Sequence, residues 1–173
     1  DFSIDQQTAE AIPHCAHLLA EIPAARLFDE FLKLFLAGNA ARTMDNLLEY
    51  DLLRYLFPGT NKCIQQDDKT LTLVQAAMGN TDERIAEGKH VTPAFILAAL
   101  LWPIVSKQFA ALESSGEAPM VAMHSAAHSA IAAAVKHISI PRRFSQPMRE
   151  IWEFQLRLQR RTGRKAVELI EHR

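Results

Sequence analysis

Prolines and glycines divide this chain into segments of helix length, and their spacing constrains the fold more than any other sequence feature. Between them, apolar residues recur three and four positions apart, as at Leu27, Phe31 and Leu34, which is the period of an amphipathic helix. Pro23 precedes this group and Gly38 follows it, as expected for the start and the end of a helix. No run alternates between apolar and polar residues as a strand does. We therefore predict an all-α fold, a compact bundle of roughly eight to ten short helices.

Caps and prolines also give the expected helix bounds. Asp5 is the expected N-cap of the first helix, with a break near Ile12 because Pro13 lacks a backbone donor. Pro103 is expected to end the nearly all-apolar segment 94–102, which should be buried on most sides, and to start another helix. The expected helical segments are 5–20, 23–38, 39–50, 52–57, 68–87, 93–102, 103–115, 119–137 and a pair from residue 145 that breaks near 162–163.

Composition excludes several classes of protein. With 49% apolar and 23% charged residues, the chain has the composition of a folded core rather than of a disordered segment. Cys15 and Cys63 are too isolated for a disulfide framework or a thiolate zinc site, which predicts a reducing, cytoplasmic location. No apolar run approaches the roughly 20 residues of a membrane span, so we expect no membrane contact.

The small net charge of −1 conceals a strong polarity along the chain. Residues 136–173 hold ten Lys and Arg against four Glu, a net charge of +6. Residues 1–135 hold nine basic and sixteen acidic residues, a net charge of −7. One basic end on a nearly neutral chain is typical of a protein with a polyanion-binding face.

The basic end contains an amphipathic helix. One side of residues 148–161 carries the apolar residues Met148, Ile151, Trp152, Phe154 and Leu158. The other side carries Arg149, Glu153, Arg157 and Arg160. The candidate RNA-binding residues are Arg142, Arg143, Arg149, Arg157, Arg160, Arg161, Arg164 and Lys165.

Two interpretations of this basic end stay open from the residues alone. The arginines either contact nucleic-acid phosphates or form a solvated face in which Arg149 and Arg157 pair with Glu153. The excess of basic over acidic residues favours contact with nucleic-acid phosphates. Phe144, Trp152 and Phe154 could stack on bases, but core packing is favoured for all three.

No group of residues completes a catalytic or metal site. His124 and His128 are four residues apart on an expected helix, but the glutamate of a zincin motif is missing. A second small cluster, His14, Cys15 and His17, has no further ligand near it. We therefore predict no catalytic residue, no metal ligand and no cofactor in this chain.

Three stretches together resemble the bacterial poly(A) polymerases, which belong to the class II nucleotidyltransferases with the CCA-adding tRNA enzymes. LLAEIPAARLFDEFLKLF at 18–35 resembles the family's neck helix, and VTPAFILAALLWP at 91–103 resembles a body helix. IPRRFS at 140–145, followed by MREIW at 148–152, QLRL at 155–158 and the arginine pair at 160–161, is similar to the RNA-binding stretch of the poly(A) polymerase branch.

The resemblance implies a neck-like helical segment over residues 1–60 and a helical body with a basic RNA-binding end over 61–173, without the family's catalytic head. The resemblance further implies that Arg26 and Glu30 support the nucleotide pocket. Their spacing alone predicts only an ordinary ion pair between residues one turn apart on a helix.

Through the resemblance we expect the RNA-binding region of an enzyme that adds AMP from ATP to RNA 3′ ends without a template. ATP and Mg²⁺ would bind the head and not this chain. The expected partner is RNA with a single-stranded 3′ end, bound by a cytoplasmic monomer. The alternatives are the body of a CCA-adding tRNA nucleotidyltransferase and a non-enzymatic helical module that binds another protein.

Overall fold

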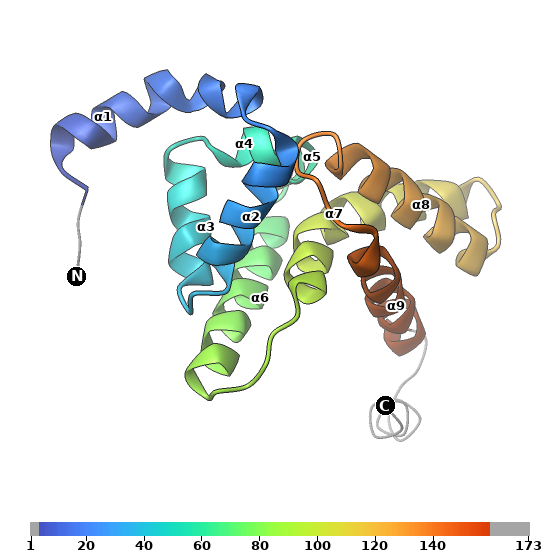
Figure 1. The fold of residues 1–173 in the computed structure, drawn as a ribbon. Coiled ribbons are helices and arrows are strands. Elements are labelled where there is room, and N and C mark those ends of the chain that lie inside the picture. The colour runs from blue at the N-terminus through green and yellow to red at the C-terminus, as the bar shows by residue number, and fades with distance from the viewer. Residues whose placement is uncertain (1–3, 160–173) are drawn as a thin grey trace.

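A computed structural model describes residues 4–159, and all regular structure in that range is helical (Figure 1). The predicted all-α class is therefore confirmed for this part of the chain. The elements are α1 (Gln6–Cys15), the 3₁₀ helix η1 (Ala16–Glu21), α2 (Ala24–Phe35), α3 (Ala40–Glu49), α4 (Leu53–Leu56), α5 (Pro58–Gln66), α6 (Asp68–Ala86), α7 (Pro93–Ser114), α8 (Pro119–Ala134) and α9 (Arg142–Gln159).

Helix α7 is the centre of the bundle. It contacts α5, α6, α8 and α9, and Figure 1 shows it in the middle of the molecule, between α6 and the pair α8 and α9. Its buried residues include the consecutive Ile96, Leu97 and Ala98, whose side chains point about 100° apart around the helix axis. The expectation that this apolar segment is buried on most sides is confirmed.

The helix boundary expected at Pro103 is wrong, because a single helix runs through this residue. Pro103 lies inside α7 and is buried, so the helix continues through it. A proline removes one backbone hydrogen bond from a helix. Burial of Leu101 and Val105 on either side of Pro103 offsets that loss.

The continuity of α7 also corrects the expectation that no apolar segment of the chain approaches the length of a membrane span. Over its 22 residues, α7 is long and apolar enough to cross a membrane by length and composition alone. Because four other helices pack against α7, its apolar surface is used inside the bundle, as in the core helix of a globular domain.

Other prolines also depart from the expected pattern. Pro13 stands inside α1, and the helix changes to 3₁₀ geometry only after Cys15. The turn expected to end at Pro58 is followed directly by α5, with Pro58 in its first turn, a helix that the sequence analysis missed. Helix α9 begins at Arg142 rather than Ser145 and continues through Pro147. The break expected near 162–163 lies outside the described residues.

The expected division at residue 60 falls within α5, which runs from Pro58 to Gln66. One cluster of buried apolar residues reaches from Phe28 in α2 to Leu156 in α9, so both sides of that division contribute to the same core. The assignment of a neck-like segment to 1–60 and a body to 61–173 stays a prediction.

The start of α3 is held by a residue distant in sequence. Asn39 stands at the N-cap as expected, but its side chain makes no capping hydrogen bond. Instead, the carboxylate of Asp82 in α6 accepts hydrogen bonds from the amides of Ala40 at 2.6 Å and Ala41 at 3.0 Å. These are free donors of the first helical turn, and a negative charge there also interacts favourably with the helix dipole.

Replacing Asp82 with alanine should therefore lower the free energy of unfolding by about 1–2 kcal/mol, as loss of a helix cap does. Urea denaturation of the two proteins measures this difference. The matched control is Asn39→Ala, which should cost less than about 0.5 kcal/mol because that side chain makes no cap bond. Equal losses in the two variants would contradict the assignment of the cap to Asp82.

Candidate nucleic-acid interface

Helix α9 has two chemically different sides. Met148, Trp152 and Leu156 are buried against α7 and α8, whereas Arg157 is exposed and Arg149 is half-buried. The predicted amphipathic helix is therefore present, with Leu156 as a buried residue that the sequence analysis had not assigned to the apolar side. Ile151, Phe154 and Leu158 are half-buried at the edges of the packed face.

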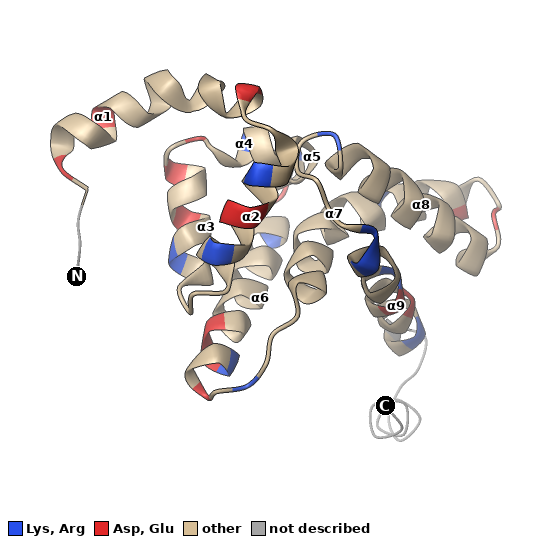
Figure 2. Ribbon diagram, viewed as in Figure 1, with Lys and Arg blue, Asp and Glu red and all other residues tan. Residues whose placement is uncertain are grey.

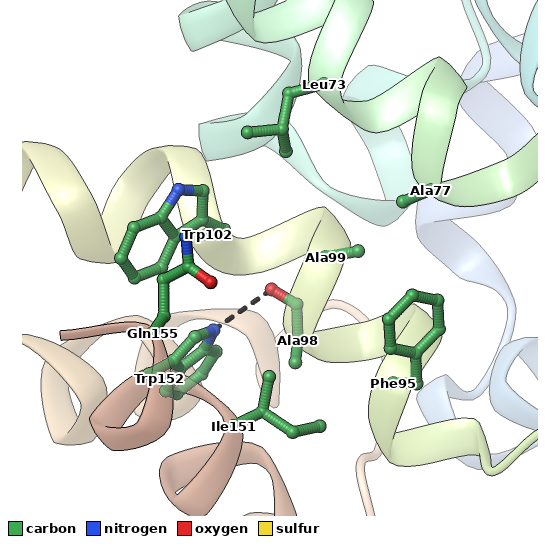
Figure 3. Close-up of a pocket in the computed structure, with 9 residues that line it drawn as sticks. All are labelled: Leu73, Ala77, Phe95, Ala98, Ala99, Trp102, Ile151, Trp152 and Gln155. Atoms are coloured by element: carbon green, nitrogen blue, oxygen red, sulfur yellow. Dashed lines mark hydrogen bonds between the residues drawn. The ribbon is translucent and has the colours of Figure 1, made fainter. Parts of the chain in front are cut away.

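Trp152 fixes the position of α9. Its indole is 1% exposed, and Nε1 donates a hydrogen bond of 3.1 Å to the carbonyl oxygen of Ala98 in α7 (Figure 3). Beside this contact is an apolar hollow of about 190 Å³ between α6, α7 and α9, with Trp102 and Leu73 in its lining. Trp152 thus serves the core, as the sequence analysis favoured.

Phe144 is also a packing residue, at the start of α9. It lies against Phe28 of α2, with 5.9 Å between ring centroids, and the guanidinium of Arg143 lies 4.9 Å from the centre of its ring. A guanidinium over an aromatic ring is a favourable arrangement that limits the conformations of the arginine. Arg143 is therefore exposed on a fixed aromatic support.

The structure describes four of the eight predicted RNA-binding residues. Arg142 and Arg143 lie in the first turn of α9, where Figure 2 shows basic residues, and Arg157 lies in its last turn. Arg142, Arg149 and Arg157 are separated by seven and eight residues, close to two helical turns each, so they form a row along one side of α9. Arg160, Arg161, Arg164 and Lys165 lie outside the described residues.

The acidic residue within this row is held by the neighbouring helix. Glu153 lies one turn from both Arg149 and Arg157, but its Oε1 contacts Nε2 of His124 in α8 at 3.0 Å. Within residues 4–159, neither Arg149 nor Arg157 forms an ion pair. The surface pairing of these arginines with Glu153, which the sequence left open, is therefore absent from the described structure.

His124 and His128 lie on one side of α8, as their spacing predicted, and both are exposed. Together with Gln146, Arg149 and Glu153 they line a hollow of about 370 Å³ between α8 and α9. Within the described part of the chain, no three His, Cys, Asp or Glu side chains come close enough to hold a metal ion. This includes the cluster of His14, Cys15 and His17.

The predicted neck pair has a different partner in the structure. Glu30 Oε1 contacts Lys33 Nζ at 2.8 Å, one turn further along α2. Its hydrogen bond with Lys33 lowers the pKa of the Glu30 carboxyl and raises the pKa of the Lys33 amine, and the positive charge of Arg26 lowers the pKa of Glu30 to a smaller extent. Arg26 and Glu30 are both exposed on α2.

Two family models match the regions that hold these features. The model described as "Probable RNA and SrmB- binding site of polymerase A" matches residues 1–64. The model described as "Polymerase A arginine-rich C-terminus" matches residues 115–173, which include α8 and α9. Both describe parts of polymerase A, so the bundle and its basic helix define a helical region of that class of enzyme.

Similarity to individual proteins covers nearly the whole chain. Poly(A) polymerase I of Salmonella typhi is 38% identical over 172 residues, which are 98% of this chain and 37% of that protein. Poly(A) polymerase I of Escherichia coli O6:H1 (strain CFT073) is 37% identical over the same length, and that of Haemophilus influenzae is 31% identical over 175 residues. The chain belongs to the bacterial poly(A) polymerase family, and it spans 37–39% of the length of these relatives.

Removing metal ions should leave the fold intact. A structural metal contributes its binding energy to folding, so a chelator would lower the melting temperature if one were bound. His124 contacts a carboxylate, and the described residues offer no set of three ligands. We expect EDTA to change neither the melting temperature nor the helicity measured by circular dichroism. A decrease that zinc reverses would show that the histidines bind metal.

Proposed function

We propose that this chain is the RNA-binding part of a poly(A) polymerase whose whole protein adds AMP from ATP to RNA 3′ ends without a template. The main observation that supports the proposal is the row of arginines on α9, formed by Arg142, Arg149 and Arg157. Guanidinium groups bind phosphate through charge and paired hydrogen bonds, and a row of them suits a chain of phosphates. The family descriptions and the names of the relatives support RNA as the partner.

The contact of Glu153 with His124 strengthens this interpretation. A free carboxylate between Arg149 and Arg157 would repel a phosphate, and a paired one would neutralise part of the row. Because Glu153 contacts His124, both arginines are without an ion pair within the described residues and are available to a ligand. The position of α9 is in turn fixed by the buried Trp152, so the row is held on a rigid element.

The finer features of the proposal rest on the resemblance. The RNA is single-stranded at its 3′ end, and the protein acts as a monomer in the cytoplasm. Its ATP and Mg²⁺ are held by a catalytic head and not by the residues described here, which offer no cluster of carboxylates for a metal ion. The names of the relatives favour poly(A) addition over CCA addition.

One observation favours a protein-binding role beside RNA binding. Helix α1 has no buried residue, and Ile4, Leu18 and Ile22 in and around α1 and η1 are exposed. Exposed apolar side chains along a helical segment that has little burial of its own are typical of a contact surface. The family model for residues 1–64 names a second partner, SrmB, beside RNA in its description.

The first test measures the salt dependence of RNA binding. Each phosphate contact with single-stranded RNA contributes about −0.7 to the slope of log affinity against log salt. Replacing Arg142, Arg149 and Arg157 together with glutamine should therefore flatten the slope by about two units. The melting temperature should change little, because glutamine is nearly as good a helix former as arginine.

The control replaces three exposed lysines outside α9, Lys62, Lys69 and Lys89, with glutamine. The change in net charge is the same, but the residues lie in the acidic part of the chain, so the slope should stay close to that of the unmodified protein. Equal effects of the two triple variants, or no effect of either, would make the arginine row a solvated surface.

The second test concerns catalysis. Two-metal phosphoryl transfer needs carboxylates that converge on one site, and the described residues bring no such group together. With ATP, Mg²⁺ and an RNA primer, the 173-residue chain should leave the primer unextended on a sequencing gel. Primer extension above the level of a mock preparation would mean that the chain contains a catalytic site.

A further inference from the structure

A hollow of about 350 Å³ lies where the N-terminal helices meet the connection between α8 and α9. We call it the junction pocket. Its apolar wall comes from η1 and α2 and includes Leu19, Ile22 and Leu27. Its polar wall consists of Arg54 and Tyr55 from α4 and of Lys136 and His137, which follow α8. Lys136 and His137 are more than 80 residues from Tyr55 and more than 100 from the apolar wall in sequence, so the fold alone brings these groups together.

The walls of the junction pocket are fixed by the fold. The amide of Ser139 donates a hydrogen bond of 3.0 Å to the carbonyl oxygen of Ala24, which ties the α8–α9 connection to the start of α2. Ile138 is completely buried beside it, so Lys136 and His137 are held in place against η1. The pocket therefore does not depend on a loop that must rearrange to form it.

The charge of the junction pocket is suited to an anion. Lys136 is exposed and makes no ion pair within the described residues. Arg54 contacts Asp51 at 2.7 Å, so its charge is partly neutralised, and it also donates a hydrogen bond of 2.8 Å to the hydroxyl of Tyr55. Lys136 is thus the available cation, with His137 beside it.

The aromatic and apolar groups add a second kind of recognition. Tyr55 is half-buried, and the guanidinium of Arg54 lies 4.9 Å from the centre of its ring. An aromatic ring beside apolar side chains, with a cation at the edge, is the combination by which proteins bind a base and its phosphate. A mixed apolar and polar lining is also usual for small-molecule sites.

We propose that the junction pocket binds one nucleotide of the RNA, with the base against Tyr55 and the apolar wall and the phosphate at Lys136. This inference rests on the proposed function, because RNA supplies the nucleotide. Lys136 and Arg142 are six residues apart, so their Cα atoms are separated by no more than about 22 Å. A short strand of RNA can therefore contact both the pocket and the arginine row on α9.

The test measures binding of labelled oligoadenylate to the 173-residue chain over a range of salt concentrations. Tyr55→Leu removes the ring but keeps an apolar side chain, and should weaken binding about tenfold without changing the salt slope, because stacking carries no charge. Tyr55→Phe keeps the ring and should bind like the unmodified protein. Lys136→Gln should weaken binding and flatten the slope by about 0.7.

Matched controls are available for both variants. Tyr50→Leu changes the other tyrosine, which is also half-buried but lies outside the pocket, and Lys62→Gln changes an exposed lysine of the acidic part. Both should bind like the unmodified protein. If Tyr55→Leu failed to fold, Lys136→Gln would still test the proposal, because Lys136 is exposed and its replacement should not affect folding.

The outcomes separate this inference from the proposed function. If the unmodified chain bound no RNA, the proposed function would be wrong. If the unmodified chain bound RNA through the α9 arginines but Tyr55→Leu and Lys136→Gln bound equally well, the junction pocket would not hold a nucleotide. Equal losses in the pocket variants and their controls would also exclude it.

Discussion

Burial of α7 by four neighbouring helices is the constraint on which the other features of this molecule depend. Because α7 is apolar on nearly all sides, it cannot be stable in water until α5, α6, α8 and α9 cover it. Packing against α7 positions α9, and the hydrogen bond from Trp152 to Ala98 sets how α9 lies on it. The side of α9 that carries Arg149 and Arg157 is therefore directed away from the core as a result of packing.

The basic surface also depends on contacts between helices. An isolated α9 would have Glu153 within one turn of two arginines, where it could pair with either. In the bundle, α8 brings His124 to Glu153, and within the described residues neither arginine forms an ion pair. The same packing places Phe144 against Phe28 and under Arg143, so a core aromatic residue supports a surface cation. Core and candidate interface are thus formed by the same contacts.

The regions matched by the two family models meet in the structure. Residues 1–64 and 115–173 are separated by α6 and α7 in sequence, yet Ala24 and Ser139 share a hydrogen bond and the junction pocket lies between the two regions. Both regions contribute buried residues to the same hydrophobic core, which explains why such distant segments form one surface. Helix α1, which has no buried residue, extends from this same end of the molecule (Figure 1).

The sequence by itself determined the helical class, the N-cap at Asp5, the left-handed turn at Gly38 after α2, the two sides of α9 and the family, because these signals lie within one or two turns of the chain. Only the tertiary structure decided that helices continue through Pro103 and Pro147, that Asp82 caps α3, that Glu153 contacts His124 and that a pocket lies beside Tyr55. The physical reason is distance along the chain. A local pattern gives the cost of a proline or an uncapped helix end, whereas the burial and hydrogen bonds that offset the cost come from residues tens of positions away.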